Sequence, residues 1–292
     1  MLTETIEKAG VLAEALPWIK KFYGKTIVIK FGGNAMDDKK LVEGILKDVV
    51  LLKFIGMNPI VVHGGGPAIN ETLAKLGKGT EFKFGNRVTD KDTMEVVEMV
   101  LTGKINKELV SLINKHGGKA IGISGKDGNL IEADKKYLLE NNEQIDIGMV
   151  GKVKKINPRI LKVLDEEGYI PVISPVGVDE EGNSYNINAD YVAGEIAGAV
   201  NADKFILLTN VQGIMKDPQD PSTLFNTLYF NEVNKLINGG TIQGGMLPKV
   251  EACMEAIKLG VNRAHILDGR IKHALLLEIF TDEGIGTMIE KK

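Results

Sequence analysis

Short runs of mostly apolar residues recur along the chain, and several are followed by a loop and a segment with helical spacing. After the first run, at residues 26–29, two glycines lead into a segment whose apolar positions Leu41, Ile45 and Leu52 share one helix face. Apolar runs of this length are typical of strands buried on both faces, and their alternation with helices is typical of a parallel sheet. The pattern predicts strands at 26–29, 59–62, 119–123, 170–173, 204–208 and 263–267.

These elements predict an α/β protein, a three-layer α/β/α sandwich with a mainly parallel open sheet. In such sheets ligands bind beyond the carboxyl ends of the strands, so the glycine-rich loops that follow the strands are where binding residues are expected. The sequence has no long linker and no low-complexity tract. We place a division into two lobes near residue 200.

The first residues form a separate pattern. Apolar positions from Leu2 to Leu16 recur at alternating four- and three-residue steps, which predicts an amphipathic helix over residues 2–16. We expect Pro17 to end that helix. The sequence shows no evident partner for its apolar stripe.

Composition narrows the class of ligand and the compartment. With 36 Lys and Arg against 39 Asp and Glu, the formal net charge is −3, so no global basic field favours nucleic acid. The single cysteine, Cys253, excludes an internal disulfide and suits a reducing cytosol. Acidic residues interrupt the apolar positions at the N-terminus, unlike a signal peptide, and no apolar run reaches the roughly 18 residues of a membrane span. We expect a cytoplasmic protein that binds small molecules rather than nucleic acid or membrane.

Two glycine loops follow the first two predicted strands. Residues 30–34 read Lys-Phe-Gly-Gly-Asn, which exposes backbone N–H groups beside a lysine; a turn with a solvated lysine is an equally good alternative. Residues 63–67 read His-Gly-Gly-Gly-Pro. Three successive glycines are typical of a loop whose N–H groups converge on an anion at a helix start. His63 has no acid beside it in sequence, and we expect it to orient the loop rather than to transfer protons.

Two further segments carry polar groups suited to a substrate. In residues 85–90, Arg87 precedes a helix, and a guanidinium can hold a carboxylate with two parallel hydrogen bonds; a surface salt bridge is the alternative. Residues 186–190 read Asn-Ile-Asn-Ala-Asp and open a helix of small residues. Asn186 and Asp190 could contact substrate or cations, although capping alone explains such residues.

The C-terminal third adds a polar strand end and a second lysine loop. Residues 208–213, Leu-Thr-Asn-Val-Gln-Gly, are what a nucleotide pocket would use. Residues 244–249, Gly-Gly-Met-Leu-Pro-Lys, pair two glycines with Lys249, and the proline suits the first turn of the next helix. The sequence therefore has two glycine loops that each carry a lysine.

Common nucleotide and metal motifs are absent from the sequence. No segment matches the P-loop pattern G-x-x-x-x-G-K-[ST], and no G-x-G-x-x-G turn follows the first strand, which disfavours P-loop proteins and nicotinamide-dependent dehydrogenases. Clusters of His and Cys are missing too, so we predict no protein-held metal site.

Taken in order, these segments resemble the acetylglutamate kinases of arginine biosynthesis, a branch of the amino-acid kinase superfamily. The resemblance covers nearly the whole chain. The glycine loops recur across the superfamily, whereas Arg-Val-Thr at 87–89, Asn-x-Asn-Ala-Asp at 186–190 and Gly-Gly-Met-x-x-Lys at 244–249 are specific to this branch. The resemblance implies phosphorylation of the side-chain carboxylate of N-acetyl-L-glutamate by ATP with Mg²⁺, giving N-acetylglutamyl 5-phosphate and ADP.

The resemblance also implies roles for individual residues. Lys30 and Lys249 would stabilise the transferring phosphoryl group, and Asp190 would organise the two lysines. In an N-terminal lobe of residues 25–199, N-acetylglutamate would bind at Gly65, Gly66, Arg87 and Asn186. The nucleotide would bind mainly in a lobe of residues 200–292, and its predicted contacts are Gly32, Gly33, Asn210, Val211, Gln212, Gly213, Ile214 and Met215. One departure is Asn210, since relatives commonly have Asp there.

The chemistry agrees with an acceptor carboxylate. A carboxylate with a pKa of about 4 is already ionised at neutral pH, so its phosphorylation needs no general base. The reaction needs the repulsion between the carboxylate and the phosphates of ATP to be reduced, and it needs the reacting groups to be in line. Lysines, backbone N–H groups and Mg²⁺ supply both. Two alternatives stay open: another kinase of the superfamily, such as glutamate 5-kinase, and a catalytically silent protein that senses arginine or binds a regulatory protein. Retention of both lysines argues against the silent protein.

Both ends of the chain resemble the arginine-sensitive acetylglutamate kinases. That resemblance implies an oligomerisation helix within residues 1–24, inhibition by arginine, and a hexamer built as a trimer of dimers. A PII-type signalling protein is a further partner to consider. The implied effector residues are His273, Glu278 and Gly284. A final amphipathic helix would explain residues 275–279 without any effector.

Overall fold

An eight-stranded sheet forms the centre of the molecule. The computed structural model describes residues 6, 9–10, 13–36, 38–140, 143–281 and 284–291. Within the sheet the strand order is β12-β14-β13-β11-β1-β2-β8-β5, and the neighbours from β13 to β5 pair in parallel. The six predicted strands are confirmed as β1 (Thr26–Phe31), β2 (Asn58–His63), β5 (Ala120–Ser124), β8 (Ile170–Ser174), β11 (Lys204–Thr209) and β13 (Arg263–Asp268).

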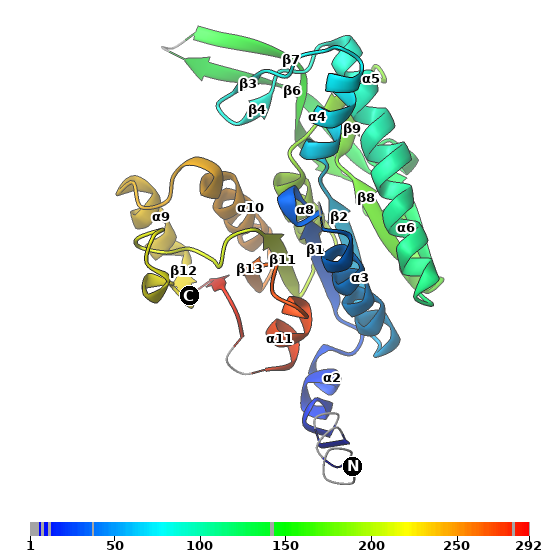
Figure 1. Ribbon diagram of the computed structural model, residues 1–292, viewed down its shortest axis with the longest axis vertical. Helices are drawn as coiled ribbons and strands as arrows, with labels where there is room; N and C mark the ends of the chain where they lie inside the picture. The colour runs from blue at the N-terminus through cyan, green and yellow to red at the C-terminus, as the bar shows by residue number, and fades with distance from the viewer. Residues whose placement is uncertain are drawn as a thin grey trace.

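Helices cover both faces of this sheet, which confirms the predicted three-layer α/β/α class (Figure 1). Successive residues of β1 point to opposite cores, because side chains alternate along a strand. Ile27 and Ile29 pack in one core and Val28 in the other. The first core includes buried residues of α3 (Lys39–Phe54), α4 (Gly66–Lys75), α5 (Lys91–Glu98), α6 (Asn106–Lys115) and α11 (Ala274–Phe280). The second includes those of α7 (Arg159–Glu166), α8 (Ala189–Ala199), α9 (Phe230–Asn238) and α10 (Leu247–Lys258).

Several short or exposed strands were not predicted. At one sheet edge, β14 (Thr287–Glu290) pairs antiparallel with β13, and β12 (Thr227–Tyr229) pairs parallel with β14. Above the carboxyl ends of the main strands, four strands close on one another: β6 (Ile131–Glu140), β7 (Glu143–Ile156), β9 (Val176–Val178) and β10 (Ser184–Asn186).

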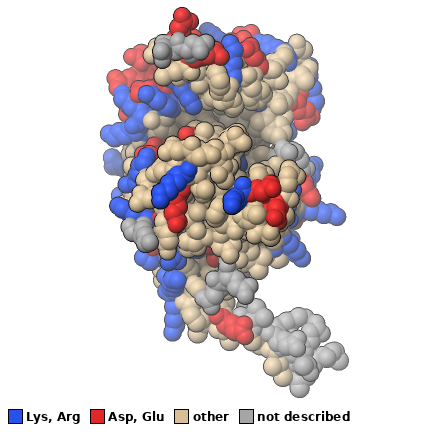
Figure 2. Space-filling model, turned by 90° about the vertical axis from the view of Figure 1, so that its left-hand side faces the viewer, with Lys and Arg blue, Asp and Glu red and all other residues tan. Residues whose placement is uncertain are grey.

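A small hairpin, β3 (Phe82–Lys83) with β4 (Asn86–Arg87), lies beside β6 and β7 (Figure 1). A cleft separates this upper part of the molecule from the part below it in the space-filling view (Figure 2). The hairpins therefore overhang the edge of the sheet at which the parallel strands end.

The N-terminal prediction needs one correction. Leu2 lies outside the described residues, but Ile6, Ala9 and Ala13 are helical. The helical residues 13–14 are followed by a turn at Ala15, so the helical run does break just before Pro17. The prediction missed a second helix, α2 (Leu16–Phe22), which has Pro17 in its first turn. A proline is tolerated there because the first-turn N–H groups have no helical acceptor. In α2, the ring of Trp18 stacks on Phe22, which is buried in the first core.

Candidate active site

Three charged residues from three elements meet at the carboxyl edge of the sheet. Lys30 Nζ, near the end of β1, lies 2.7 Å from Asp190 Oδ1, and Lys249 Nζ lies 3.2 Å from Asp190 Oδ2. Asp190 is in the first turn of α8 and is 4% exposed. Burial would raise the pKa of Asp190, but the charges of the two lysines outweigh it and hold that pKa below its usual range. Asp190 is therefore an ionised bridge between the two lysines.

Local sequence explains how these side chains come together. A Cβ atom at Gly32 would lie 3.0 Å from Lys30 Nζ and 3.1 Å from the backbone nitrogen of Gly64, so the absence of a side chain lets the two glycine loops close over the lysine. Asn188 caps α8 by accepting a 2.8 Å hydrogen bond from the N–H of Asp190. This cap fixes the turn from which the Asp190 carboxylate reaches the lysines.

A cavity of 230 Å³ opens beside this bridge. Its lining includes the residues predicted to bind substrate, which are Gly65, Gly66, Arg87 and Asn186, together with Lys30, Asp190 and the predicted nucleotide residue Gly33. Gly65 and Gly66 begin α4, whose unpaired N–H groups and positive end favour an anion. The structure thus brings the substrate set together in one place, which we call the acceptor cavity.

Arg87 is the strongest candidate for holding a ligand charge in the acceptor cavity. The residue is 7% exposed, and its Nη2 donates a 3.2 Å hydrogen bond to the carbonyl of Gly66. Its Nη1 is buried and has no hydrogen-bond partner among the described residues. A buried guanidinium nitrogen without an acceptor is costly, so a bound carboxylate would stabilise it. Asn186 also lines this cavity, and its Nδ2 donates a 3.3 Å hydrogen bond to Thr89 Oγ1.

His63 is fully buried behind the glycine loop. Its Nδ1 lies 3.0 Å from the carbonyl of Gly64, so Nδ1 carries the proton, and Nε2 accepts a 3.2 Å hydrogen bond from the side chain of Asn106. Burial lowers the pKa of His63 to about 4, which keeps the ring neutral. These contacts suit the predicted orienting role. Sequence reasoning missed Asn106, because a polar residue inside a helical segment carries no motif.

A second cavity, of 530 Å³, lies on the other side of Lys249 and is called the nucleotide cavity below. Five of the predicted nucleotide residues line it: Asn210, Val211, Gly213, Ile214 and Met215. Lys249 lines this cavity and contacts Asp190, which lines the acceptor cavity. Gly32 contributes to neither lining and lies against Lys30, and Gln212 lines a third cavity.

That third cavity, of 840 Å³, brings the two chain ends together. Trp18 and Phe22 of α2 line it, as do Glu278 of α11 and Gly284. Glu278 Oε1 lies 3.0 Å from Lys204 Nζ and 2.9 Å from His265 Nδ1. Burial would raise the pKa of Glu278, but the hydrogen bond from His265 and the charge of Lys204 lower it to about 2.

The structure does not bring His273 into this set. Its Nδ1 bonds to Asp48 of α3 at 2.7 Å, and its backbone is left-handed at φ 59° where α11 begins. His265 is the histidine that lines the third cavity with Glu278. Sequence reasoning missed Lys204 and His265, because both lie inside strands that were read as structural.

The fold and the site define a class of protein. Residues 25–268 match the Amino acid kinase family, and the chain belongs to this family.

Close relatives narrow the resemblance further. The chain is 58% identical over 290 residues to the acetylglutamate kinase of Pelotomaculum thermopropionicum, a match that covers 98% of each chain. It is also 58% identical over 291 residues to the acetylglutamate kinase of Halothermothrix orenii, which covers 100% of each. The resemblance to acetylglutamate kinases is confirmed, and so is the expectation of an enzyme of the kinase class.

Solved structures share the fold. N-acetylglutamate synthase from Neisseria gonorrhoeae matches with a TM-score of 0.83 at 24% identity in its complex with coenzyme A and N-acetyl-glutamate, covering 97% of this chain and 63% of the synthase chain. The complex of that synthase with coenzyme A and L-arginine matches with a TM-score of 0.81 at 23% identity, covering 97% of this chain and 65% of the other. At such identities the likeness shows the fold alone.

Proposed function

We propose that the chain transfers the γ-phosphoryl group of ATP to the side-chain carboxylate of N-acetyl-L-glutamate, as a step of arginine biosynthesis. The observation that carries the proposal is the Lys30-Asp190-Lys249 bridge, because Asp190 lines the acceptor cavity and Lys249 lines the nucleotide cavity. A phosphoryl group that moves between the two cavities would pass both ammonium groups. The names of the close relatives supply the acceptor.

Recognition of the acceptor would use groups that are incompletely paired in this structure. Arg87 Nη1, buried without a partner among the described residues, would bind the α-carboxylate. Asn186 would hydrogen-bond the neutral acetamido group, and the N–H groups at the start of α4 would face the carboxylate that reacts. We assign acceptor binding to a lobe of residues 25–199.

Catalysis would rest on position and charge rather than on proton transfer. The acceptor carboxylate is already ionised, so the transfer requires no general base. His63 is buried and neutral, which agrees with a site that transfers no proton. An oxygen of the acceptor forms a bond to phosphorus while the bond from phosphorus to the β–γ bridging oxygen breaks, and that electron pair leaves with ADP. Lys30 and Lys249 stabilise the charge on the transferring group, and Asp190 keeps the two ammonium groups in place.

The nucleotide would occupy the cavity of 530 Å³ in a lobe of residues 200–292. The described residues include no group of three His, Cys, Asp or Glu side chains placed to hold a metal, and Asp190 is committed to two lysines. Mg²⁺ would therefore bind through the phosphates of ATP, whose negative charge it neutralises. The amide of Asn210 can still donate and accept hydrogen bonds in this cavity.

We assign inhibition by arginine to the third cavity. Glu278 uses Oε1 for both of its ion pairs, which leaves Oε2 beside Gly284 with a 3.2 Å hydrogen bond from the N–H of Ile285. That oxygen would receive the guanidinium of arginine, and Lys21 and Arg263 in the same lining would face its carboxylate. The synthase of similar fold is known in complex with L-arginine, but that likeness shows the fold alone, so the assignment rests on the charges that line this cavity. His273 would position α11 through Asp48 instead of touching the effector.

The N-terminal helix within residues 1–24 would join copies of the chain into a hexamer, a trimer of dimers. Two of its apolar side chains, Ile6 and Leu16, are 62% and 50% exposed, as expected of a surface that another copy covers. A PII-type protein would be a further regulatory partner. None of the described helices is both long enough and apolar enough to cross a membrane. We propose a cytoplasmic location, because the proposed reaction is a step of amino-acid biosynthesis.

Release of ADP with a panel of acceptors tests the proposed substrate. N-acetylglutamate should be used, whereas glutamate, aspartate, carbamate and UMP should be poor acceptors. Glutamate would bring an ammonium group into a site suited to a neutral amide, and such mismatches can cost several powers of ten in kcat/KM. Equal kcat/KM values for glutamate and N-acetylglutamate would overturn the assignment and favour a glutamate kinase.

A further inference from the structure

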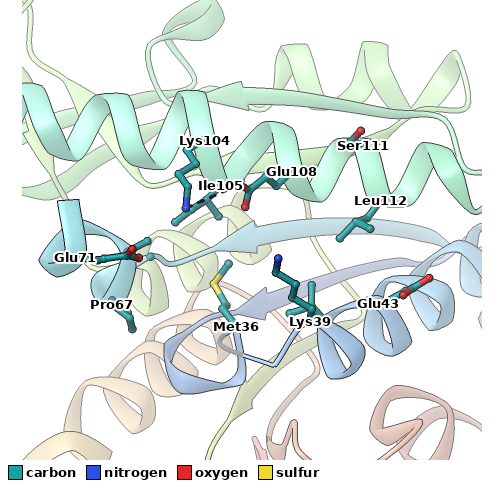
Figure 3. Close-up of a pocket in the computed structure, with 13 residues that line it drawn as sticks. Met36, Lys39, Glu43, Pro67, Glu71, Lys104, Ile105, Glu108, Ser111 and Leu112 are labelled. Carbon is teal, nitrogen blue, oxygen red and sulfur yellow. Dashed lines mark ion pairs between the residues drawn. The ribbon is translucent and has the colours of Figure 1, made fainter. Parts of the chain in front are cut away.

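A groove of 680 Å³ lies outside the three cavities of the proposed function, between α3, α4 and the helical run that leads into α6 (Figure 3). Its apolar surface comes from side chains of these three segments, including Val42, Ala68, Ile105 and Leu112. Charged side chains, among them Lys39, Glu71 and Lys104, line the groove as well. Small-molecule sites commonly combine an apolar floor with a few charged groups.

The groove and the acceptor cavity share a wall. Gly65 lines both, and a Cβ atom at Gly65 would lie 2.4 Å from Ile105 Cδ1 and 2.6 Å from Leu101 Cδ2. Ile105 faces the groove, and Leu101 lines the acceptor cavity. Both residues belong to a π-helical segment, Met99–Ile105, and such segments frequently occur at functional sites. A molecule that displaces Ile105 would therefore press on the loop that begins α4.

The two lysines of the groove have little opposite charge beside them among the described residues. Lys39 and Lys104 point into the groove from opposite walls (Figure 3). Lys39 has no ion pair within the described part of the chain, and the Nζ of Lys104 is 3.9 Å from the nearest oxygen of Glu108. The other two lining carboxylates have their own partners, since Glu71 pairs with Lys75 and Glu43 lies 2.9 Å from His116 Nε2.

We propose that this groove binds a small amphipathic carboxylate and that the bound molecule weakens binding in the acceptor cavity through Ile105 and Gly65. The carboxylate sits between the ammonium groups of Lys39 and Lys104, and the branched or cyclic hydrocarbon part covers Ile105 and Leu112. The coupling rests on the proposed function, because it is measured as a change in the affinity for the acceptor. The binding itself is measured without turnover.

The test of binding compares two molecules of the same shape, 4-methylpentanoate and its neutral amide, by calorimetry or ligand-observed NMR on the full chain. The carboxylate should bind with a Kd on the order of 1 mM, and the amide at least about five-fold more weakly. Lys39→Ala and Lys104→Ala should each weaken binding of the carboxylate by about five-fold. Lys40→Ala is the matched control, since Lys40 is the next residue of α3 but does not line the groove. The proposal would be overturned if the carboxylate did not bind at roughly 20 mM, about 20 times the expected Kd. Equal affinity for the amide, or an equal effect of Lys40→Ala, would also overturn it.

The test of coupling uses the same probe in steady-state kinetics. The carboxylate should raise the KM for N-acetylglutamate by about five-fold, the lower end of typical allosteric couplings, and leave kcat unchanged. Ile105→Val removes the Cδ1 atom nearest to Gly65, so this variant should bind the probe with a smaller change in KM. Binding with an unchanged KM would overturn the coupling. An enzyme that binds the probe but does not phosphorylate N-acetylglutamate would instead overturn the proposed function and leave the binding site standing.

Discussion

Among single residues, Lys249 links the two cavities most directly. Its ammonium group lines the nucleotide cavity and lies 3.2 Å from Asp190 in the acceptor cavity. If Lys249 stabilises charge that moves during transfer, Lys249→Met should lower kcat by a factor of about 10² and change the KM for ATP less. Steady-state kinetics measures both. Lys258→Met on the same helix removes an exposed lysine that pairs with Glu255, and it should behave as wild type. A near-normal kcat with a raised KM would make Lys249 a binding residue.

Glu278 and Lys204 form an ion pair that is almost completely buried, with side chains 8% and 6% exposed. Glu278→Gln should lower the free energy of unfolding by about 3 kcal/mol, because Lys204 would keep its charge in a buried site without a counter-ion. The double variant Glu278→Leu with Lys204→Met should recover part of that loss, since it buries no charge. Urea denaturation gives both values. A double variant less stable than Glu278→Gln would contradict this account of the pair.

Burial of His63 makes stability depend on pH. Its pKa is lowered from 6.5 to about 4, so between those values the unfolded chain takes up a proton that the folded chain does not. The contribution to stability is complete above pH 6.5 and is lost as the pH falls toward 4. We expect Tm to decrease between pH 7 and pH 5, and we expect His63→Gln to reduce that decrease. A Tm that depends on pH equally in both proteins would show that His63 does not titrate in this way.

Much of the candidate site could be predicted from the types of residue and their order along the chain. Lys30, Asp190 and Lys249 were found from glycine loops and a helix start, and the structure places them within hydrogen-bond reach. Asn106, Lys204 and His265 were missed, because polar residues inside helices and strands have no local signature. Their contacts come from elements far apart in the chain, as in the pair of Lys204 with Glu278. His273 was implied by the resemblance at the C-terminal segment, but in the structure it bonds to Asp48, while His265 lies beside Glu278.

At the scale of elements, α2 is the link between the N-terminus and the third cavity. Trp18 and Phe22 anchor this helix on the cavity, whereas Ile6 before it is mostly exposed. Deletion of residues 1–14 should leave the kinase fold intact, reduce the size of the assembly to a dimer and abolish inhibition by arginine. Light scattering and velocity against arginine concentration measure the two effects. An unchanged size would contradict an oligomerisation role, and a wild-type enzyme indifferent to arginine would contradict the effector site.

Burial decided which elements could be predicted. The six central strands are covered on both faces, so each is a nearly continuous apolar run, such as β11 with every residue buried. In contrast, β6 and β7 mix buried and exposed residues and carry many lysines and glutamates, so their sequences resemble polar loops. The short strands β12 and β14 gain their partners only from the assembled sheet. Pro17 was not expected to begin α2, although the first turn of a helix accepts a residue that its interior excludes.

In the whole molecule, one sheet carries both halves of the site. β1 ends in Lys30 and Phe31, and it pairs with β2 of the N-terminal half and with β11 of the C-terminal half. The acceptor and nucleotide cavities therefore meet where these halves join, at the lysine pair held by Asp190. The chain carries a net charge of −3, so attraction for two anionic substrates must come from this local site.

The product of the reaction tests the central claim most directly, because phosphorylation of a carboxylate gives an acyl phosphate. Such a product reacts with hydroxylamine to form a hydroxamate, whereas ATP hydrolysis gives ADP and phosphate alone. The enzyme should be incubated with ATP, Mg²⁺, hydroxylamine and N-acetylglutamate, and the hydroxamate and ADP should be measured together. The account predicts equal amounts of the two with wild type and a loss of both with Lys249→Met. Release of ADP without hydroxamate would contradict it.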